Sequence, residues 1–502
     1  MIRFWKNNQA LLVTLIVTIA FFALVTQVLE LRVTVSILLS GLTLGAITFL
    51  VASGLSLIFG LMDVLNFAHG AIFVFGAYVG LSAFENPRLL FNTLPFILAL
   101  SASTYLAVNF GDRLWRRVSA KELQRALWLL SLALSLGLLA FALRRFPITA
   151  LNAFDVTAVG GAVSTSQAQE PMGLMVQRVL VVFLAGFPLG LALAPKESAE
   201  EARRRPGWRV IAYALALLIL GYVILWVRDP GESLWLGLPV DARFALAILF
   251  AALAGVLIGI VIETTLIRPF YGSPVTQLVL TLGLSIVAID LIELVWGQEG
   301  HPPMQPPTLF TGACRSESLL AWFSEGCRSI DVLGRAFPTY RLFIILTGVL
   351  VFTGVGLLLK RSRLGMIIRA GVQDSEMVQA LGINVRQVFT FVFALGSAMA
   401  ALGGVIVAPF LGVFPEMGAI FLLQAFIAVV IGGMGSYAGA AVGTILLGLA
   451  RAFGDHFVAV GIDLPFLATT LKGSPAMARA STVLLMAIVL LVRPAGIFGK
   501  KE

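Results

Sequence analysis

The chain has 502 residues, of which 59% are apolar and only 12% are Asp, Glu, Lys or Arg, against roughly 45–50% and 25% in soluble domains. This composition excludes a soluble globular protein and indicates a core built inside a membrane. Two cysteines and three histidines are too few for a cysteine or histidine metal centre, so we expect no metal and no cofactor. The net charge of +9 would suggest nucleic acid in a soluble protein. In a membrane protein it instead raises the question of which side holds the positive charge, and no nucleic-acid partner is expected.

Apolar runs close to the length of a bilayer crossing recur along the whole chain. They predict an all-α, polytopic transmembrane helical bundle of about 12–14 spans, in which re-entrant or broken helices can occur. The predicted spans are 10–28, 38–59, 68–84, 92–110, 126–143, 174–194, 209–227, 244–267, 275–296, 342–360, 388–411, 419–433, 436–453 and 476–492. The pair 419–433 and 436–453 has a second interpretation as short re-entrant helices.

Basic residues gather in three loops that fall on one side of the membrane when the N-terminus is cytoplasmic. They are Arg113, Arg116, Arg117, Lys121 and Arg125 in the first loop, Lys196, Arg203, Arg204, Arg205 and Arg209 in the second, and Lys360, Arg361, Arg363, Arg369 and Arg386 in the third. Since cytoplasmic loops are enriched in Lys and Arg, this side is the cytoplasm. The number of predicted spans is even, so both termini are expected there.

The longest non-membrane stretch, 297–341, lies outside on this topology and contains both cysteines, Cys314 and Cys327. An oxidising compartment favours a disulfide between them, which would limit the freedom of the unfolded loop. Two free thiols are the alternative.

The motif Asn66-Phe67-Ala68-His69-Gly70 joins two apolar segments and brings polar side chains close to the membrane. Polar groups there are costly unless they are paired or face a cavity, which favours a functional site. The alternative is a satisfied turn in which Asp63 or Asn66 caps the next helix.

A second motif, Gly432-Gly433-Met434-Gly435-Ser436, interrupts an apolar stretch. It predicts unwound backbone or a sharp re-entrant turn of the kind that solute pathways use, whereas close helix packing is the ordinary alternative. Combining both motifs gives a candidate translocation path of Asn66, His69, Gly70, Gly432, Gly433 and Gly435.

Residues 360–386 form the most soluble-looking element of the chain. A short helix is predicted from Ser375 to Leu381, with Met377 and Val378 on an apolar face, and Gly382 is a typical helix stop. Such a helix either docks on a partner or lies on lipid headgroups, and the residues alone do not decide between them.

Enzymatic signatures are absent from the sequence. There is no G-x-x-x-x-G-K-[ST] phosphate loop and no paired nucleophile and base, so the chain is not expected to be an enzyme and any nucleotide energy must come from a partner. A stand-alone secondary transporter or channel is one rival, with Glu263, Asp290 and Glu293 as its candidates for ion coupling. A membrane-bound enzyme is the other, and it would need a cluster of acids, histidines or arginines at one interface.

Several motifs in register resemble the permease subunits of the branched-chain (hydrophobic) amino acid family of ABC importers. They are Gly41-Leu42-Thr43-Leu44-Gly45, Asn66 to Gly70, Arg268-Pro269, Arg369-Ala370 through Leu381-Gly382-Ile383-Asn384, and Gly432 to Ser436. The resemblance covers about residues 36–85 and 242–500. It implies a multi-pass protein of the bacterial inner membrane that works with two ATP-binding cassette subunits, a second homologous permease in a heterodimer, and a periplasmic substrate-binding protein.

The same resemblance implies that leucine, isoleucine and valine or other hydrophobic amino acids are carried, with urea or short amides as the alternative. In such importers an E-A-A-x-x-x-G pattern docks on the ATPase. Here Glu376, Met377, Val378 and Gly382 occupy the pattern, so both alanines are replaced. The residues then expected at the ATPase contact are Arg369, Glu376, Met377, Val378, Leu381 and Gly382.

Three parts are predicted along the chain. An N-terminal permease segment spans 1–85, an inserted block with about four transmembrane helices spans 86–241, and the C-terminal permease core spans 242–502 and includes the coupling loop 361–386. No function follows from the sequence of the inserted block.

Overall fold

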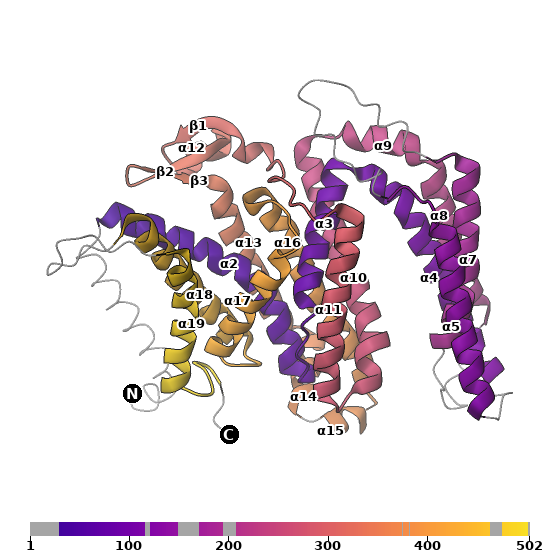
Figure 1. Ribbon diagram of the computed structural model, residues 1–502. Helices are drawn as coiled ribbons and strands as arrows, with labels where there is room; N and C mark the ends of the chain where they lie inside the picture. The colour runs from indigo at the N-terminus through magenta and orange to yellow at the C-terminus, as the bar shows by residue number, and fades with distance from the viewer. Residues whose placement is uncertain are drawn as a thin grey trace. The chain divides into compact units, whose positions relative to one another are not determined.

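The computed structural model describes residues 30–115, 121–148, 170–193, 207–373, 375–380, 382–461 and 474–499. These residues form two compact units, which are described separately (Figure 1). Unit 1 consists of Met1–Leu81, Val240–Glu293 and Gly297–Glu502, and unit 2 of Ser82–Pro239 and Leu294–Trp296. That the chain between 86 and 241 is an insertion stays a prediction.

Within the described residues, ten helices are long and apolar enough to cross a membrane. Three further apolar helices are shorter, His69–Glu85, Met417–Gly432 and Ala480–Val492. The predicted all-α polytopic bundle is therefore confirmed, and every predicted span that falls on described residues coincides with one of these helices. The span predicted at 10–28 lies outside the described residues, as do parts of the first two basic loops. Of the proposed re-entrant pair only the first is short, since the second runs from Tyr437 to Val460.

Unit 1 is organised around α2 (Leu31–Met62), a 32-residue helix. It packs against α13, α16, α17 and α18, which come from the distant C-terminal half of the chain. The other helices of this unit are α3 (His69–Glu85, which continues into unit 2), α10 (Val240–Ile262), α11 (Pro274–Trp296), α13 (Thr339–Arg361), α14 (Arg363–Gln373), α15 (Ser375–Ala380), α16 (Val385–Leu411), α17 (Met417–Gly432), α18 (Tyr437–Val460) and α19 (Pro475–Val492). α2 is buried along most of its length. Its small residues allow the other helices to approach it closely.

A small sheet lies between α11 and α13. Its strands are β1 (Gly312–Ser316), β2 (Cys327–Val332) and β3 (Arg335–Pro338), and α12 (Leu319–Glu325) connects the first two. β1 and β2 are parallel, with Ser316 opposite Ile330, and β2 and β3 are antiparallel, with Ile330 opposite Phe337. A disulfide joins Cys314 to Cys327, so the two cysteines are paired as expected.

Unit 2 contains α4 (Pro87–Trp115), α5 (Lys121–Leu143), α7 (Met172–Leu193), α8 (Gly207–Trp226) and α9 (Arg228–Leu236). α4 packs against α7 and α8, and α5 packs against α7. Its mostly buried charges are paired, with Arg88 to Glu232 at 2.7 Å and Arg178 to Glu170 at 2.7 Å. Such pairing satisfies charges that would be costly in an apolar bundle.

Candidate functional site

The motif at Asn66 forms the connection between α2 and α3. The Asn66 side chain is 1% exposed, and its Oδ1 accepts a hydrogen bond from the Ala68 amide at 3.0 Å. From α11, the Thr281 hydroxyl accepts the Phe67 amide at 3.2 Å. Asn66 therefore forms a turn that leads into α3, as in the turn interpretation of this motif, although its Nδ2 has no hydrogen-bond partner among the described residues. Thr281 of α11 fixes the position of Phe67.

His69 is the first residue of α3 and its side chain is fully buried. Its Nε2 lies 3.2 Å from the carbonyl oxygen of Val51 in α2. Since a carbonyl only accepts, Nε2 carries the proton and donates. A Cβ at Gly54 would stand 2.7 Å from this nitrogen, so glycine at that position makes room for the imidazole. His69 thus links the start of α3 to α2.

Gly70 lies where α3 meets α17. A Cβ at Gly70 would be 2.5 Å from the carbonyl oxygen of Gly418, so only glycine fits. Beside it is a cavity of about 460 Å³ whose lining is mostly apolar and comes from α3, α11, α17 and their flanking loops, with Phe67, Gly70, Leu282, Leu422, Phe426 and Glu416 among its residues. Among the described residues that line it, Glu416 is the one with a charged side chain. Phe67 and Gly70 belong to the predicted motif, but the rest of the lining comes from helices far apart in the sequence, so the motif alone did not indicate a cavity.

The glycine run forms the predicted sharp turn, because α17 ends at Gly432 and α18 begins at Tyr437. Gly433 and Gly435 have φ of +103° and +78°, values that side-chain-bearing residues rarely adopt. Ser436 caps α18 by accepting the Gly439 amide at 3.0 Å.

Gly432 is also a packing position. A Cβ there would lie 2.0 Å from the carbonyl oxygen of Gly439, and its own carbonyl accepts the Phe498 amide at 2.9 Å. The turn interpretation and the packing interpretation of this motif therefore describe different glycines of the same run.

The two motifs contact the same helix at different positions. His69 packs against Gly54 of α2, whereas Gly435 packs against Gly60 of α2. Gly432, Gly433 and Gly435 do not line the cavity beside Gly70. Both motifs therefore contact α2.

The predicted coupling loop forms two short helices, α14 and α15. In Figure 1 they lie at the end of unit 1 opposite the β1–β3 sheet. Ser362 caps α14 by accepting the Gly365 amide at 2.9 Å, and the Arg369 guanidinium donates to the Leu359 carbonyl. Arg369 is therefore engaged by α13 and helps to anchor the loop.

The residues of the predicted docking pattern differ in their surroundings. Val378 is buried against unit 1, whereas Met377 is 63% exposed. Gly382 has φ +79°, as a helix stop requires. Leu381 and the side chain of Glu376 lie outside the described residues. α15 thus presents an apolar side chain to its exposed face while Val378 anchors it.

A buried charge cluster connects α10 to α16. Glu263 begins a π-helical segment, Glu263–Ile267, followed by a short 3-10 turn, Arg268–Phe270. Its fully buried carboxylate accepts hydrogen bonds from Arg268 at 2.8 Å and from the Thr390 hydroxyl at 2.8 Å, and also from the Tyr271 hydroxyl. Burial and the bond to Glu263 raise the pKa of Tyr271, so this hydroxyl stays protonated and donates.

The cluster concerns Glu263 as a candidate for ion coupling. The Glu263 carboxylate forms an ion pair with Arg268 and accepts hydrogen bonds from Thr390 and Tyr271 of the same chain. The close spacing of Glu263, Arg268 and Tyr271 is a sequence signal that could have indicated part of this cluster, but Thr390 is 127 residues away from Glu263. π-helical segments occur frequently at functional sites, and here the segment joins α10 to the start of α16, directly after the coupling loop.

The comparisons with known proteins agree on one family. A family model described as "Branched-chain amino acid transport system / permease component" matches residues 204–492. The Escherichia coli K12 "High-affinity branched-chain amino acid transport system permease protein LivH" is 30% identical over 295 residues, which cover 58% of this chain and 83% of LivH. The Pseudomonas aeruginosa permease protein BraD is 32% identical over 247 residues, 49% of this chain and 71% of BraD.

More distant similarity extends to sugar transport. The Haemophilus influenzae "Ribose import permease protein RbsC" is 28% identical over 218 residues, which cover 42% of this chain and 59% of RbsC. No solved structure matches the chain significantly. The family match over more than half of the chain, together with its multi-pass helical fold, means that this chain belongs to the permease component family of branched-chain amino acid transport systems.

Proposed function

We propose that this chain is the membrane-spanning subunit of an ATP-driven importer and forms the translocation path for branched-chain or other hydrophobic amino acids that a periplasmic binding protein delivers. The observation that carries the proposal is the family match, supported by the names of LivH and BraD. The apolar cavity beside Gly70 favours an aliphatic side chain over a sugar, because sugar hydroxyls would find few hydrogen-bond partners there.

The energy for transport comes from two ATP-binding cassette subunits, since the chain itself has no phosphate-binding loop. They dock on α15, where the exposed Met377 offers an apolar contact. A second homologous permease completes the membrane part as a heterodimer. ATP binding closes the ATPase pair, and the motion passes as rigid-body displacement through α15 to α16. The Glu263–Thr390 bond then carries it to α10.

The proposed solute path runs along the cavity beside Gly70. Asn66 and His69 act by holding the start of α3, so that Phe67 and Gly70 face this cavity. Gly432, Gly433 and Gly435 allow the tight connection between α17 and α18 and thereby set the position of α17. All six residues shape the path, although only Gly70 lines the cavity itself.

The orientation follows from the basic loops. The α14–α15 end is cytoplasmic, both termini are cytoplasmic, and the β1–β3 sheet with its disulfide is periplasmic, in the bacterial inner membrane. Single-cysteine labelling tests this directly in a background lacking Cys314 and Cys327, with Met366→Cys and Leu320→Cys as the exposed probes. An impermeant thiol reagent applied outside should label the second probe only. Labelling of Met366→Cys alone would overturn the orientation.

Assembly is tested by co-expressing the chain with candidate ATP-binding subunits and a second permease, then purifying through a tag on this chain. The proposal predicts a stable complex whose ATPase activity rises when the binding protein and leucine are added. Purification of the chain alone from cells that contain all these subunits would contradict it.

A further inference from the structure

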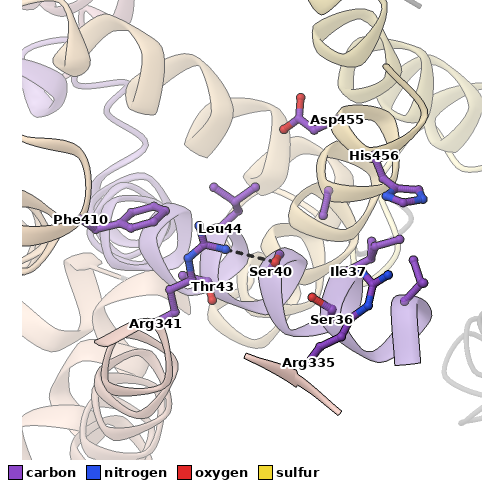
Figure 2. Close-up of a pocket in the computed structure, with 12 residues that line it drawn as sticks. Ser36, Ile37, Ser40, Thr43, Leu44, Arg335, Arg341, Phe410, Asp455 and His456 are labelled. Carbon is purple, nitrogen blue, oxygen red and sulfur yellow. Dashed lines mark hydrogen bonds between the residues drawn. The ribbon is translucent and has the colours of Figure 1, made fainter. Parts of the chain in front are cut away.

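A second cavity, of about 380 Å³, lies in unit 1 beside strand β3. It is formed by the N-terminal half of α2, the start of α13 and the C-terminal part of α18, with Arg335 from β3 and Phe410 from α16 (Figure 2). On the proposed orientation this cavity faces the periplasm. None of its residues belongs to the translocation path or the coupling helix described above.

The lining of this cavity is cationic and rich in hydroxyl groups. Arg335 and Arg341 contribute two guanidinium groups, and Ser36, Ser40 and Thr43 of α2 contribute hydroxyls. Asp455 is the one carboxylate among the lining residues that the structure describes. It is bound by Arg451, one turn earlier, at 3.0 Å. In the described part of the chain no carboxylate lies within ion-pair distance of Arg335 or Arg341.

Arg341 is held in place with part of its donor capacity unused. One terminal nitrogen donates to the Ser40 hydroxyl at 3.3 Å, and the guanidinium carbon stands 4.9 Å from the ring centre of Phe410, a cation–π contact. Its Nε is buried and has no acceptor among the described residues. A buried donor without an acceptor is costly, and the planar guanidinium fork is suited to binding a carboxylate through two hydrogen bonds.

The remaining lining matches the other parts of an amino acid. Asp455 is half exposed, so its carboxylate can accept from an ammonium group in addition to Arg451. Val33, Ile37, Leu44 and Ala452 add aliphatic surface. The cavity therefore combines a site for a carboxylate, a site for an ammonium and an apolar wall within a volume at the lower end of the range typical of small-molecule sites.

We propose that this cavity is an outer binding site for an aliphatic α-amino acid, in which Arg341 binds the solute carboxylate with the help of Ser40. The proposal rests on the proposed function, because it takes the solute to be an amino acid that arrives from the periplasmic side. It adds a site on the permease itself that distinguishes an amino acid from an uncharged amide.

The test uses the purified permease complex with its ATPase subunits, in detergent and without a binding protein. Binding is followed by ligand-observed NMR with millimolar leucine, 4-methylpentanoate, which lacks the ammonium group, and 3-methylbutylamine, which lacks the carboxylate. Leucine should bind most tightly, 4-methylpentanoate less tightly, and the amine least. Equal binding of leucine and the amine, or no binding of leucine, would overturn the proposal without any mutation.

Variants locate the site. Arg341→Gln should weaken leucine binding by about tenfold, and Ser40→Ala should weaken it by a smaller factor. The matched control is Arg328→Gln, which removes the same charge from an exposed position on β2. Unchanged leucine binding in a folded Arg341→Gln or Ser40→Ala variant would contradict the assignment. If Arg341→Gln does not fold, Ser40→Ala and the three ligands still decide the question.

Uptake measurements separate this proposal from the proposed function. ATP-driven leucine uptake by the complete system with no leucine binding at this cavity would refute the outer site and leave the importer function intact. Arg341-dependent leucine binding without ATP-driven uptake would support the outer site and contradict the importer function. Binding of an acidic peptide but not of free leucine would indicate that the cavity receives a protein side chain, and would also refute the proposal.

Discussion

The sequence indicated two sets of functional residues most clearly, one around His69 and one on the helix α15. The two sets differ in their exposure to solvent. His69 is fully buried, donates to Val51 and packs against Gly54. Met377 of α15 is 63% exposed on a helix of six residues. The first region is packed inside the chain, although His69 Nδ1 and Asn66 Nδ2 have no hydrogen-bond partner among the described residues, whereas Met377 lies on the surface, where another subunit could contact it. Substitutions should therefore act through stability in the first region and through assembly in the second.

The largest loss of stability and transport is expected for a substitution at Gly432, where the backbone of α17 contacts the backbone of α18 at Gly439. In Gly432→Ala the new methyl group would lie 2.0 Å from the Gly439 carbonyl oxygen, so the α17–α18 hairpin must open. Overpacking of this kind costs about 1–3 kcal/mol or more, and we expect a lower melting temperature together with a loss of transport.

The control for Gly432→Ala is Gly354→Ala in α13, where a Cβ meets nothing within 4 Å and alanine should be neutral or slightly stabilising. Equal stability of the two variants would contradict the packing role. Lost transport with unchanged stability in Gly432→Ala would show that this glycine acts in the path directly.

The second-largest effect is expected for a substitution on α15 and concerns binding of the ATPase subunits. Met377→Asp should leave the melting temperature of the isolated permease unchanged, because the side chain is exposed, but should weaken binding of the ATPase subunits by about tenfold, equivalent to about 1.4 kcal/mol. Pull-down and ATPase stimulation measure this. Leu320→Asp is the matched control, with a side chain that is 85% exposed on α12 beside the sheet. Similar results for both variants would remove α15 from the ATPase contact.

Gly382 is a weaker choice for that experiment. Its φ of +79° strains any side chain placed there, so a loss of activity would not separate docking from folding.

A smaller effect is expected at His69. His69→Leu removes the donor to Val51, at a cost of about 0.5–1.5 kcal/mol, whereas His69→Gln retains an N–H donor. We expect transport to fall a few-fold in the leucine variant, in parallel with its melting temperature, and to fall less in the glutamine variant. Loss of transport in both variants at unchanged melting temperature would mean that His69 contacts the solute.

The smallest effect on transport is expected from the disulfide. Replacing Cys314 and Cys327 with serine frees a loop whose closure contributes about 3 kcal/mol to local stability, but the bond lies within the small sheet. Limited proteolysis between 312 and 338 should speed up while transport changes less than twofold. A fall in transport as large as that of Met377→Asp would give the sheet a direct part in transport.

The lengths of the apolar runs and the positions of the glycines explain why much of this fold could be predicted. The apolar runs located the helices because a bilayer crossing needs about 20 apolar residues, and the glycine run located the α17–α18 turn because positive φ favours glycine. The sheet was not expected, since its strands have only four to six residues and lie in a polar loop. Both cavities and the Glu263–Thr390 bond depend on helices that are distant in sequence, and local patterns do not report such contacts.

The central claim is that ATP hydrolysed by partner subunits drives inward movement of an amino acid through this chain. Proteoliposomes containing this chain, the second permease and the two ATPase subunits test it most directly, with the binding protein and labelled leucine on the face that carries the sheet and ATP on the face that carries α15. The account predicts leucine accumulation that requires ATP and is reduced by Met377→Asp. Accumulation driven by an ion gradient, by this chain alone and without ATP, would contradict it and identify a secondary transporter.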